Sequence, residues 1–273
     1  MNTLFENDAV HIAQTIAGNG KQDFAKFYNT KFNHAGLVDD TNDLYDSFNL
    51  GLHVGDDPRR VLDNRAKLLI ALPHAKRIVW LNQVHGNHIE HITKRLDNTL
   101  LNADALITEC AGVALAIMTA DCVPVAIFDE HKVACVHAGW QGLVAGIINK
   151  TCQHISTQKY AYIGACISGA AYEVSYELAR RIVDDCVRQR LVEPNADELF
   201  AMIVKPSTSV DKVLLDIATL AKLQLMACDV QLINQDIACS YHDERFYSYR
   251  AQTHAGKRAT GRMAMLITKK TNK

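Results

Sequence analysis

The sequence predicts an α/β fold, a single-domain layered sandwich with a mixed β-sheet core flanked by helices, over residues 1–273. Apolar runs of strand length alternate along the chain with segments whose apolar residues recur at helical spacing. No internal repeat, low-complexity segment or linker rich in Pro, Gly or Ser divides the sequence. Both observations favour one domain in which strands and helices intermix.

The N-terminal part contains one well-defined helix. Asp57 precedes Pro58, and this pair starts a helix well because Asp caps helix N-termini and Pro suits the first turn. Apolar residues follow at helical spacing until Pro73 ends the segment. Weaker periodicity predicts helices over residues 8–17 and 23–28.

Strands dominate the middle of the chain. Residues 77–86 predict a strand with a polar end, and residues 88–92 predict the strand that returns beside it. Residues 112–142 hold the strongest pattern, because apolar runs rich in β-branched residues stop there at polar residues. The connection over residues 129–132 is short, which predicts antiparallel pairing of the flanking strands and therefore a mixed sheet.

Helices and strands alternate in the C-terminal half. Apolar spacing predicts helices there, the last of them capped by Ser209, and short apolar runs predict the strands between them. The predicted helices are residues 143–155, 176–191 and 209–226, and the predicted strands are residues 160–169, 229–239 and the last apolar run of the chain.

Charge and composition limit the partners. The formal net charge is −1 and the pI about 6.9, which gives no bulk affinity for nucleic acid or an anionic membrane. The N-terminal residues do not resemble a signal peptide, and no apolar run is long enough to span a membrane. We therefore expect a cytoplasmic protein that binds neither nucleic acid nor a membrane. Our expectation for its oligomeric state is a monomer or a homodimer. None of the 8 cysteines forms a CxxC motif, so most are expected to be buried thiols.

Three side chains stand out because each ends a strand-like run. His85 precedes Cys122 by 37 positions, and His137 follows it by 15. Two imidazoles and a thiolate suit zinc, with a fourth position left open as in catalytic sites. Cys122 is alternatively a nucleophile activated by His137, or the three are loop histidines and a buried thiol. The spacing matches no compact metal motif, so the residues alone leave all three interpretations open.

Groups that could hold an anion are less specific. The backbone of Gly139–Gly142 precedes a helix and is suited to an anion, or the glycines only make a tight turn. Four basic residues near the C-terminus either bind phosphate or form a solvated face: Arg250, Lys257, Arg258 and Arg262. Three polar residues of the stretch FNLGLHVGDD either contact substrate or shape a turn: Asn49, His53 and Asp56.

Several strings together resemble the bacterial laccase-domain family, which is also described as purine nucleoside phosphorylases, polyphenol oxidases and peptidoglycan-editing factors. They are NQVHG (82–86), ADALIT (103–108), TADCVPV (119–125), VHAGWQG (136–142) and the terminal FYSYR and TGRMAMLI. SFNLGLHVGDDP (47–58) and YIGACISGAAYEV (162–174) fit as well. The resemblance covers most of the chain from about residue 47 to the end.

The resemblance implies an α/β sandwich distantly similar to the cysteine deamidase domain of cytotoxic necrotizing toxins. It implies that His85, Cys122 and His137 are zinc ligands, with copper as the alternative metal. It also implies phosphorolysis of adenosine, inosine and S-methyl-5'-thioadenosine to base and pentose-1-phosphate, together with adenosine deamination. A copper polyphenol oxidase would need several coppers where we find one ligand set. A peptidoglycan-editing or amide hydrolase with Cys122 as its nucleophile is the other alternative.

This activity requires further roles. Beside Cys122 and His137, we expect Asp121 and His53 to transfer protons. The residues expected to bind substrate or phosphate are Asn49, Gly139, Gln141 and Arg250. The chain departs from the family pattern at Gln141, where a basic residue is common, at Ala165, where proline is usual, and at residues 33–40, where a Gly-Gly-Val-Ser stretch is usual. Of these departures, Gln141 bears most on an anion site.

Overall fold

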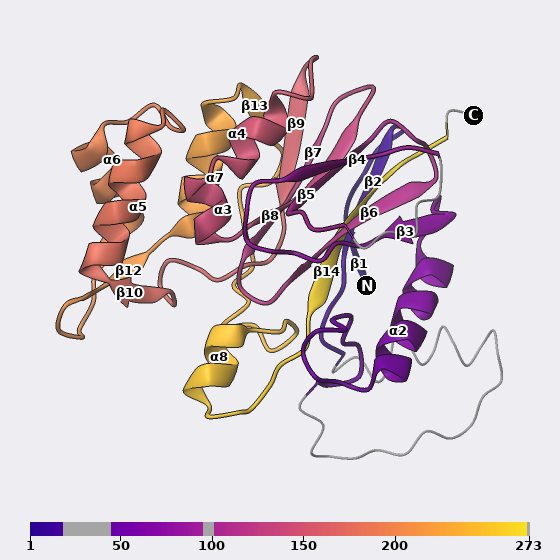
Figure 1. The fold of residues 1–273 in the computed structure, drawn as a ribbon, viewed down its shortest axis with the longest axis horizontal. Coiled ribbons are helices and arrows are strands. Elements are labelled where there is room, and N and C mark those ends of the chain that lie inside the picture. The colour runs from indigo at the N-terminus through magenta and orange to yellow at the C-terminus, as the bar shows by residue number, and fades with distance from the viewer. Residues whose placement is uncertain (19–44, 95–100, 272–273) are drawn as a thin grey trace.

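Two β-sheets stacked face to face form the centre of the computed structural model, which describes residues 1–18, 45–94 and 101–271 (Figure 1). The first sheet has five strands, in the order β1 (Asn2–Glu6), β2 (Val10–Gln14), β14 (Met263–Lys269), β6 (Val113–Thr119) and β3 (Arg77–Val79). The second sheet has six, in the order β13 (Val230–Leu232), β9 (Lys159–Ile163), β7 (Val123–Phe128), β8 (Val133–Ala138), β5 (Ala105–Thr108) and β4 (Ile89–Ile92). Both sheets combine parallel and antiparallel pairs, so the predicted mixed α/β class is confirmed.

Alternation along the strands explains the stacking. In β6, Val113, Leu115 and Ile117 point into the core between the two sheets, where they meet residues of β7 and β8. The intervening Ala114 and Ala116 face helix α2 (Pro58–Ala71) on the outer side. Small side chains on that face allow the helix to pack closely against the sheet. The helix begins where the sequence predicts, with the Asp57 side chain accepting a hydrogen bond from the N–H of Arg59 at 2.9 Å.

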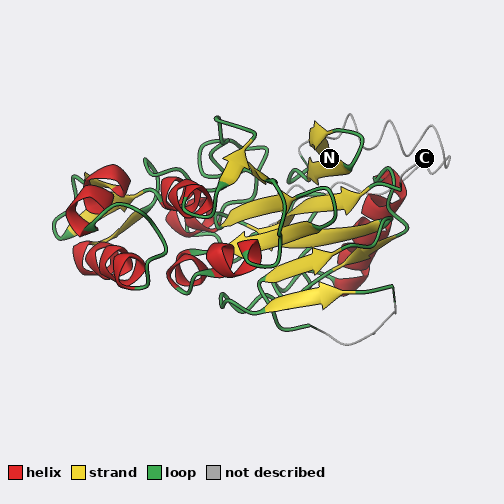
Figure 2. Cartoon of the chain, turned by 90° about the horizontal axis from the view of Figure 1, so that it is seen from above, coloured by secondary structure: helices red, strands yellow, loops and turns green. Residues whose placement is uncertain are grey.

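Other helices cover the outer face of the second sheet (Figure 2). Those against the sheet are α3 (Trp140–Val144), α4 (Ile147–Cys152) and α7 (Ile217–Met226). Beyond them lies a smaller sheet of β10 (Glu173–Ser175), β12 (Lys212–Leu215) and β11 (Val204–Pro206), which packs with α5 (Tyr176–Arg188) and α6 (Ala196–Ile203). Helix α8 (Tyr249–His254) precedes the last strand. No helix in the described ranges is long and apolar enough to cross a membrane.

Some sequence predictions are confirmed. Residues 123–128 and 133–138 pair antiparallel as β7 and β8, and the helix predicted over 176–191 is α5. The helix predicted over 143–155 is divided into α3 and α4 at Gly146, whose φ of 75° lies in the left-handed region.

Other predictions are wrong. The helix predicted over 8–17 is strand β2, which pairs with β14 from the far end of the sequence; the one predicted over 23–28 lies outside the described residues. Strand β4 does not return beside residues 77–86 but pairs parallel with β5 in the other sheet.

The helix predicted over 209–226 begins only at Ile217, with Asp216 rather than Ser209 as its N-cap. Residues 212–215 form the central strand of the small sheet instead.

Candidate functional site

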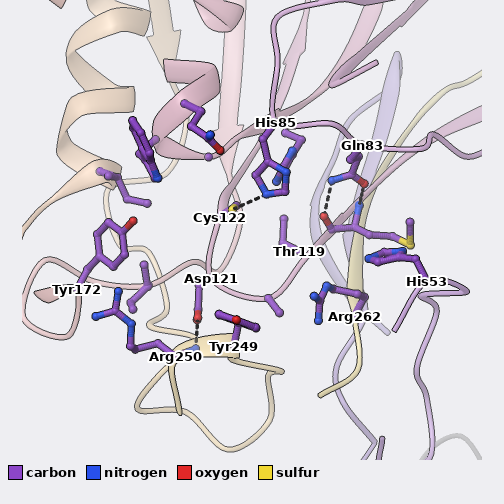
Figure 3. A pocket seen from close by; sticks show the side chains of 18 residues that line it. His53, Gln83, His85, Thr119, Asp121, Cys122, Tyr172, Tyr249, Arg250 and Arg262 are labelled. Atoms are coloured by element: carbon purple, nitrogen blue, oxygen red, sulfur yellow. Dashed lines mark hydrogen bonds between the residues drawn. The ribbon is translucent and has the colours of Figure 1, made fainter. Parts of the chain in front are cut away.

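Strand ends from both sheets bring His85, Cys122 and His137 together, as the sequence predicts. His85 follows β3 in a loop and has a left-handed φ of 58°, Cys122 directly precedes β7, and His137 lies in β8. The register of β7 and β8 pairs Pro124 with His137, so the thiol and the imidazole lie at the same sheet edge. One ligand atom from each of the three residues lies within 4.8 Å of the others, and Figure 3 shows His85 and Cys122 facing one another.

The distances and donor types fit a metal ion. Cys122 Sγ lies 4.0 Å from His85 Nε2, and a tetrahedral zinc with ordinary Zn–S and Zn–N bonds would place these atoms roughly 3.6 Å apart. The rings of His85 and His137 are 4.7 Å apart between centroids and meet edge to face at 81°. A thiolate with two imidazoles suits zinc or copper. Within the described ranges, this is the only group of three or more His, Cys, Asp or Glu side chains placed to hold a metal.

Asp104 lies behind these ligands and was not singled out from the sequence. Its carboxylate is fully buried and accepts a hydrogen bond from His137 Nδ1 at 2.8 Å. It also accepts from the backbone N–H groups of His85 at 3.0 Å and Gly86 at 2.7 Å. Asp104 therefore fixes the loop that carries His85 and orients His137 so that its Nε2 faces the Cys122 thiol. Carboxylates commonly play this part behind metal-bound histidines. The string ADALIT contained the signal, because an aspartate inside an apolar strand needs buried partners.

Cys122 and His137 shift each other's pKa. Burial opposes ionisation of Cys122, but the neighbouring His137 and His85 outweigh it and lower the pKa of the thiol to about 6. Burial likewise opposes the charged form of His137, but Cys122 and Asp104 raise the pKa of its imidazole to about 9. Without a metal, Cys122 and His137 therefore form a thiolate–imidazolium pair near neutral pH.

The ligands open into a cavity of about 410 Å³. Most of the residues predicted to act on substrate line it: His53, Asp121, Gly139, Gln141 and Arg250. Gly139 is tightly enclosed, because a Cβ added there would lie 3.1 Å from Cys122 Sγ and 3.3 Å from His85 Cδ2. Any larger residue at this position would press on two of the ligands.

Asn49, predicted to contact substrate, does not line this cavity. It is fully buried, its side-chain N–H donates to Asp56 at 2.8 Å, and its Oδ1 accepts from the N–H of Gly51 at 2.9 Å and of Arg262 at 2.8 Å. These bonds use the amide within the protein. Asn49 therefore supports the cavity wall from behind.

Asp121 is held by partners on both sides. Its Oδ1 accepts from the Ser240 hydroxyl and its Oδ2 from the backbone N–H of Arg250, each at 2.7 Å. Figure 3 shows the second of these bonds, which joins the residue before Cys122 to helix α8. With both oxygens engaged, the carboxylate connects two walls of the cavity.

Aromatic residues that the sequence analysis gave no role complete the lining, together with one of the four basic residues for which it considered phosphate binding. Three aromatic side chains contribute, Trp140, Tyr172 and Tyr249, together with Arg262, whereas Lys257 and Arg258 do not. The Arg250 guanidinium lies 4.9 Å from the centroid of the Tyr172 ring and donates to the carbonyl of Glu173 at 2.7 Å. Several of these residues stand in the strings FYSYR and TGRMAMLI, which contain the signal but not the direction in which each side chain points.

Comparison with known proteins identifies the family. Residues 33–270 match the family described as multi-copper polyphenol oxidoreductase laccase. The chain belongs to this laccase family. The purine nucleoside phosphorylase PA4543 of Pseudomonas aeruginosa is 36% identical over 229 residues, which cover 82% of this chain and 86% of that protein. The purine nucleoside phosphorylase YfiH of Escherichia coli is 35% identical over the same length and coverage.

A solved structure agrees with this family assignment. Protein NMB0706 of Neisseria meningitidis superposes with a TM-score of 0.73 at 28% identity, over 97% of this chain and 98% of that one. The laccase-family chain thus shares its fold with that protein along nearly its whole length.

Proposed function

We propose that this laccase-family protein is a zinc-dependent purine nucleoside phosphorylase that also deaminates adenosine. The observation that carries the proposal is the convergence of His85, Cys122 and His137 on a cavity lined by aromatic and basic side chains. The names of the relatives support the reaction class. Adenosine, inosine and S-methyl-5'-thioadenosine are the proposed nucleosides, and cytoplasmic pools would supply them.

The proposed metal ligands are Nε2 of His85, Sγ of Cys122 and Nε2 of His137. Asp104 holds the proton on Nδ1 of His137, so that Nε2 presents a lone pair. A bound zinc would act as a Lewis acid and lower the pKa of a water molecule that it holds. Because His85, Cys122 and His137 all line the cavity, a metal held by them would supply this chemistry to a substrate bound there.

We assign the purine base to the aromatic wall. A flat, weakly polar base is recognised by stacking, which is worth about 1–3 kcal/mol per base. Tyr172 is restrained by the Arg250 guanidinium on its ring and lines the cavity with Trp140 and Tyr249. These rings supply a stacking surface that accepts both adenine and hypoxanthine.

Phosphorolysis then needs an oxyanion held below the ribose. A phosphate oxygen forms a bond to C1', the bond from C1' to N9 of the base breaks, and the base leaves with the electron pair of that bond and takes up a proton. Arginine is suited to hold the phosphate because its guanidinium presents several donors to anionic oxygens. Arg250 and Arg262 both reach the cavity.

Deamination adds water to C6 of adenine and releases ammonia, so a group must move a proton between them. His53 lines the cavity, and its pKa is lowered by burial first and then by the charges of Arg262, Arg65 and His85. The imidazole is therefore neutral at pH 7 and able to accept a proton. Asp121, with both oxygens engaged, serves in this proposal to position Arg250.

One observation favours a second candidate, an amide hydrolase such as a peptidoglycan-editing enzyme. His137 lowers the pKa of Cys122, and the resulting thiolate and imidazolium form the kind of ion pair that thiol nucleophiles use. A copper polyphenol oxidase is less well supported, because the described residues offer one ligand group and multicopper chemistry needs several.

Base release with and without phosphate tests the proposal. We expect the purified protein to release hypoxanthine from inosine only when phosphate is present, with an equal yield of ribose-1-phosphate. Chromatography measures both products. Release of base without phosphate would identify a nucleoside hydrolase instead, and intact nucleosides combined with cleavage of an amide substrate would favour the thiol enzyme.

A further inference from the structure

Arg262 is a half-buried cation that forms no salt bridge with any described residue. Its Nη1 donates to the backbone carbonyls of Thr260 at 3.2 Å and Gly261 at 3.0 Å. No carboxylate in the described part of the chain forms an ion pair with it. Burial lowers the pKa of this guanidinium, yet an arginine remains charged in a protein. The charges of Cys122 and Asp121 favour the charged guanidinium without forming a salt bridge with it. A partly desolvated guanidinium that lines an open cavity with no salt bridge indicates an anionic ligand.

The protein fixes this side chain in one place. The backbone N–H of Arg262 donates to Asn49 Oδ1 at 2.8 Å. A Cβ added at Gly51 would lie 2.8 Å from Arg262 Cγ, so only glycine leaves room for the arginine to cross there. A guanidinium that is oriented before the ligand arrives loses little entropy on binding. Asn49 and Gly51 thus act as its support.

An unpaired hydroxyl lies on the same wall. Thr119 is 2% exposed and lines the cavity, and its Oγ1 has no hydrogen-bond partner among the described residues. The register of β6 and β14 places Thr119 opposite Met263, the neighbour of Arg262. Figure 3 shows Thr119, Arg262 and His53 on one side of the cavity. Buried hydroxyls are rarely left unpaired, so a second, independent group there lacks its partner.

The other cavity arginine is differently engaged. The Arg250 guanidinium lies on the Tyr172 ring and donates to the Glu173 carbonyl, which assigns it to the wall that holds the base. On the opposite wall, Arg262, Thr119 and His53 offer a fixed cation, a hydroxyl and an imidazole, the donors that bind tetrahedral phosphoryl oxygens.

We propose that Arg262, Thr119 and His53 form a phosphoryl-anion subsite. The source of the anion rests on the proposed function: in phosphorolysis, this subsite holds the inorganic phosphate that attacks C1'. The same donors would otherwise hold a phosphoryl group carried by the substrate. The expectation that Gly139–Gly142 and Arg250 hold phosphate is replaced by this assignment.

Calorimetric titration of the purified protein with inorganic phosphate, and separately with adenosine 5'-monophosphate, tests the subsite. Arg262→Gln should weaken binding of the anion by about 10–100-fold, the loss expected for charge-assisted hydrogen bonds. Thr119→Val should weaken it by about 2–10-fold, the range for a neutral hydrogen bond. Thr119→Val should nevertheless keep or raise the melting temperature, because it removes a buried unpaired hydroxyl. Arg188→Gln is the control, an exposed arginine on α5 paired with Asp185.

The outcomes separate the subsite from the proposed function. The subsite is refuted if wild type binds neither anion, if Arg262→Gln binds both as tightly as wild type, or if only Arg250→Gln loses binding. Binding of the monophosphate alone, lost in Arg262→Gln, would uphold the subsite but contradict phosphorolysis. Binding of inorganic phosphate that is lost in Arg262→Gln, with a matching rise in the KM for phosphate, supports both.

Discussion

Replacing Asp104 with asparagine should weaken metal binding although Asp104 is not a ligand. The carboxylate accepts from His137 Nδ1, the N–H of His85 and the N–H of Gly86. An asparagine offers one acceptor oxygen, and its NH₂ group must face a donor that was previously satisfied. If the amide oxygen keeps the imidazole, Gly86 loses its acceptor; if it keeps Gly86, His137 loses the group that fixes its Nδ1 proton.

The size of the effect follows from these contacts. A lost hydrogen bond to a buried charged group costs about 1.5–3 kcal/mol, and leaving its partner unpaired adds to this. We expect the free energy of unfolding of the metal-free Asp104→Asn protein to fall by about 2–5 kcal/mol. Loss of the group behind a ligating histidine commonly weakens metal binding by about 10–100-fold, which is the expected rise in the zinc Kd.

A matched control separates metal binding from general stability. Asp129 follows β7 at the end of the strand opposite to Cys122. It is 4% exposed, and its carboxylate accepts from the N–H groups of His131 at 2.8 Å and Lys132 at 2.6 Å. Urea unfolding and competition with a chromogenic chelator measure both quantities. Asp129→Asn should lose stability but keep its zinc affinity. The reasoning is refuted if Asp104→Asn binds zinc as tightly as wild type, or if the two variants weaken zinc binding equally.

Three further predictions concern the ligands and the base. Gly139→Ala should weaken zinc binding with little loss of stability, because the added Cβ presses on Cys122 and His85; chelator competition unchanged from wild type would argue against this crowding. Tyr172→Ala should raise the KM for inosine by about 5–100-fold through lost stacking and leave the KM for phosphate unaltered, a split that steady-state kinetics measures and that an equal rise in both constants would contradict. In metal-free wild type, the absorbance of the Cys122 thiolate should appear as pH rises, with a midpoint near pH 6. The Cys122→Ser variant should lack this absorbance change. Because this pKa is depressed, its stabilising contribution is present above the unfolded pKa of ~8.5 and is lost as pH falls through 6; a midpoint near 8.5 would disprove the coupling to His137.

Much of the fold is predictable because its signals are local. β6, β7 and β8 are fully buried runs of six or seven residues, and the short connection between β7 and β8 fixes their antiparallel pairing. The N-cap and proline of α2 are likewise adjacent in sequence. β2 is predicted as a helix because the pattern of residues 8–17 does not show its pairing with β1 on one side or with β14 on the other, where Leu266 lies opposite Ala13 although some 250 positions separate them.

The site follows the same rule. His85, Cys122 and His137 were identified because each ends a run of its own, although their meeting depends on register and on the Asp104 contacts. Arg262 and Asn49 show the limit of this approach. The sequence does not distinguish Arg262 from the three other basic residues near the C-terminus, and it predicts that Asn49 contacts substrate. Only the packing of β14 against the segment at Asn49–Gly51 turns the arginine into the cavity and the amide behind it.

The most direct test of a metal-dependent nucleoside phosphorylase combines metal analysis with turnover. Wild type and Cys122→Ser are purified in parallel, their zinc content is measured, and phosphate-dependent release of hypoxanthine from inosine is followed before and after chelation. The account predicts about one zinc per wild-type chain, its loss together with activity in Cys122→Ser, and recovery of wild-type activity when zinc is returned after chelation. Full phosphorolysis by chelated wild type, or by Cys122→Ser without metal, would contradict it.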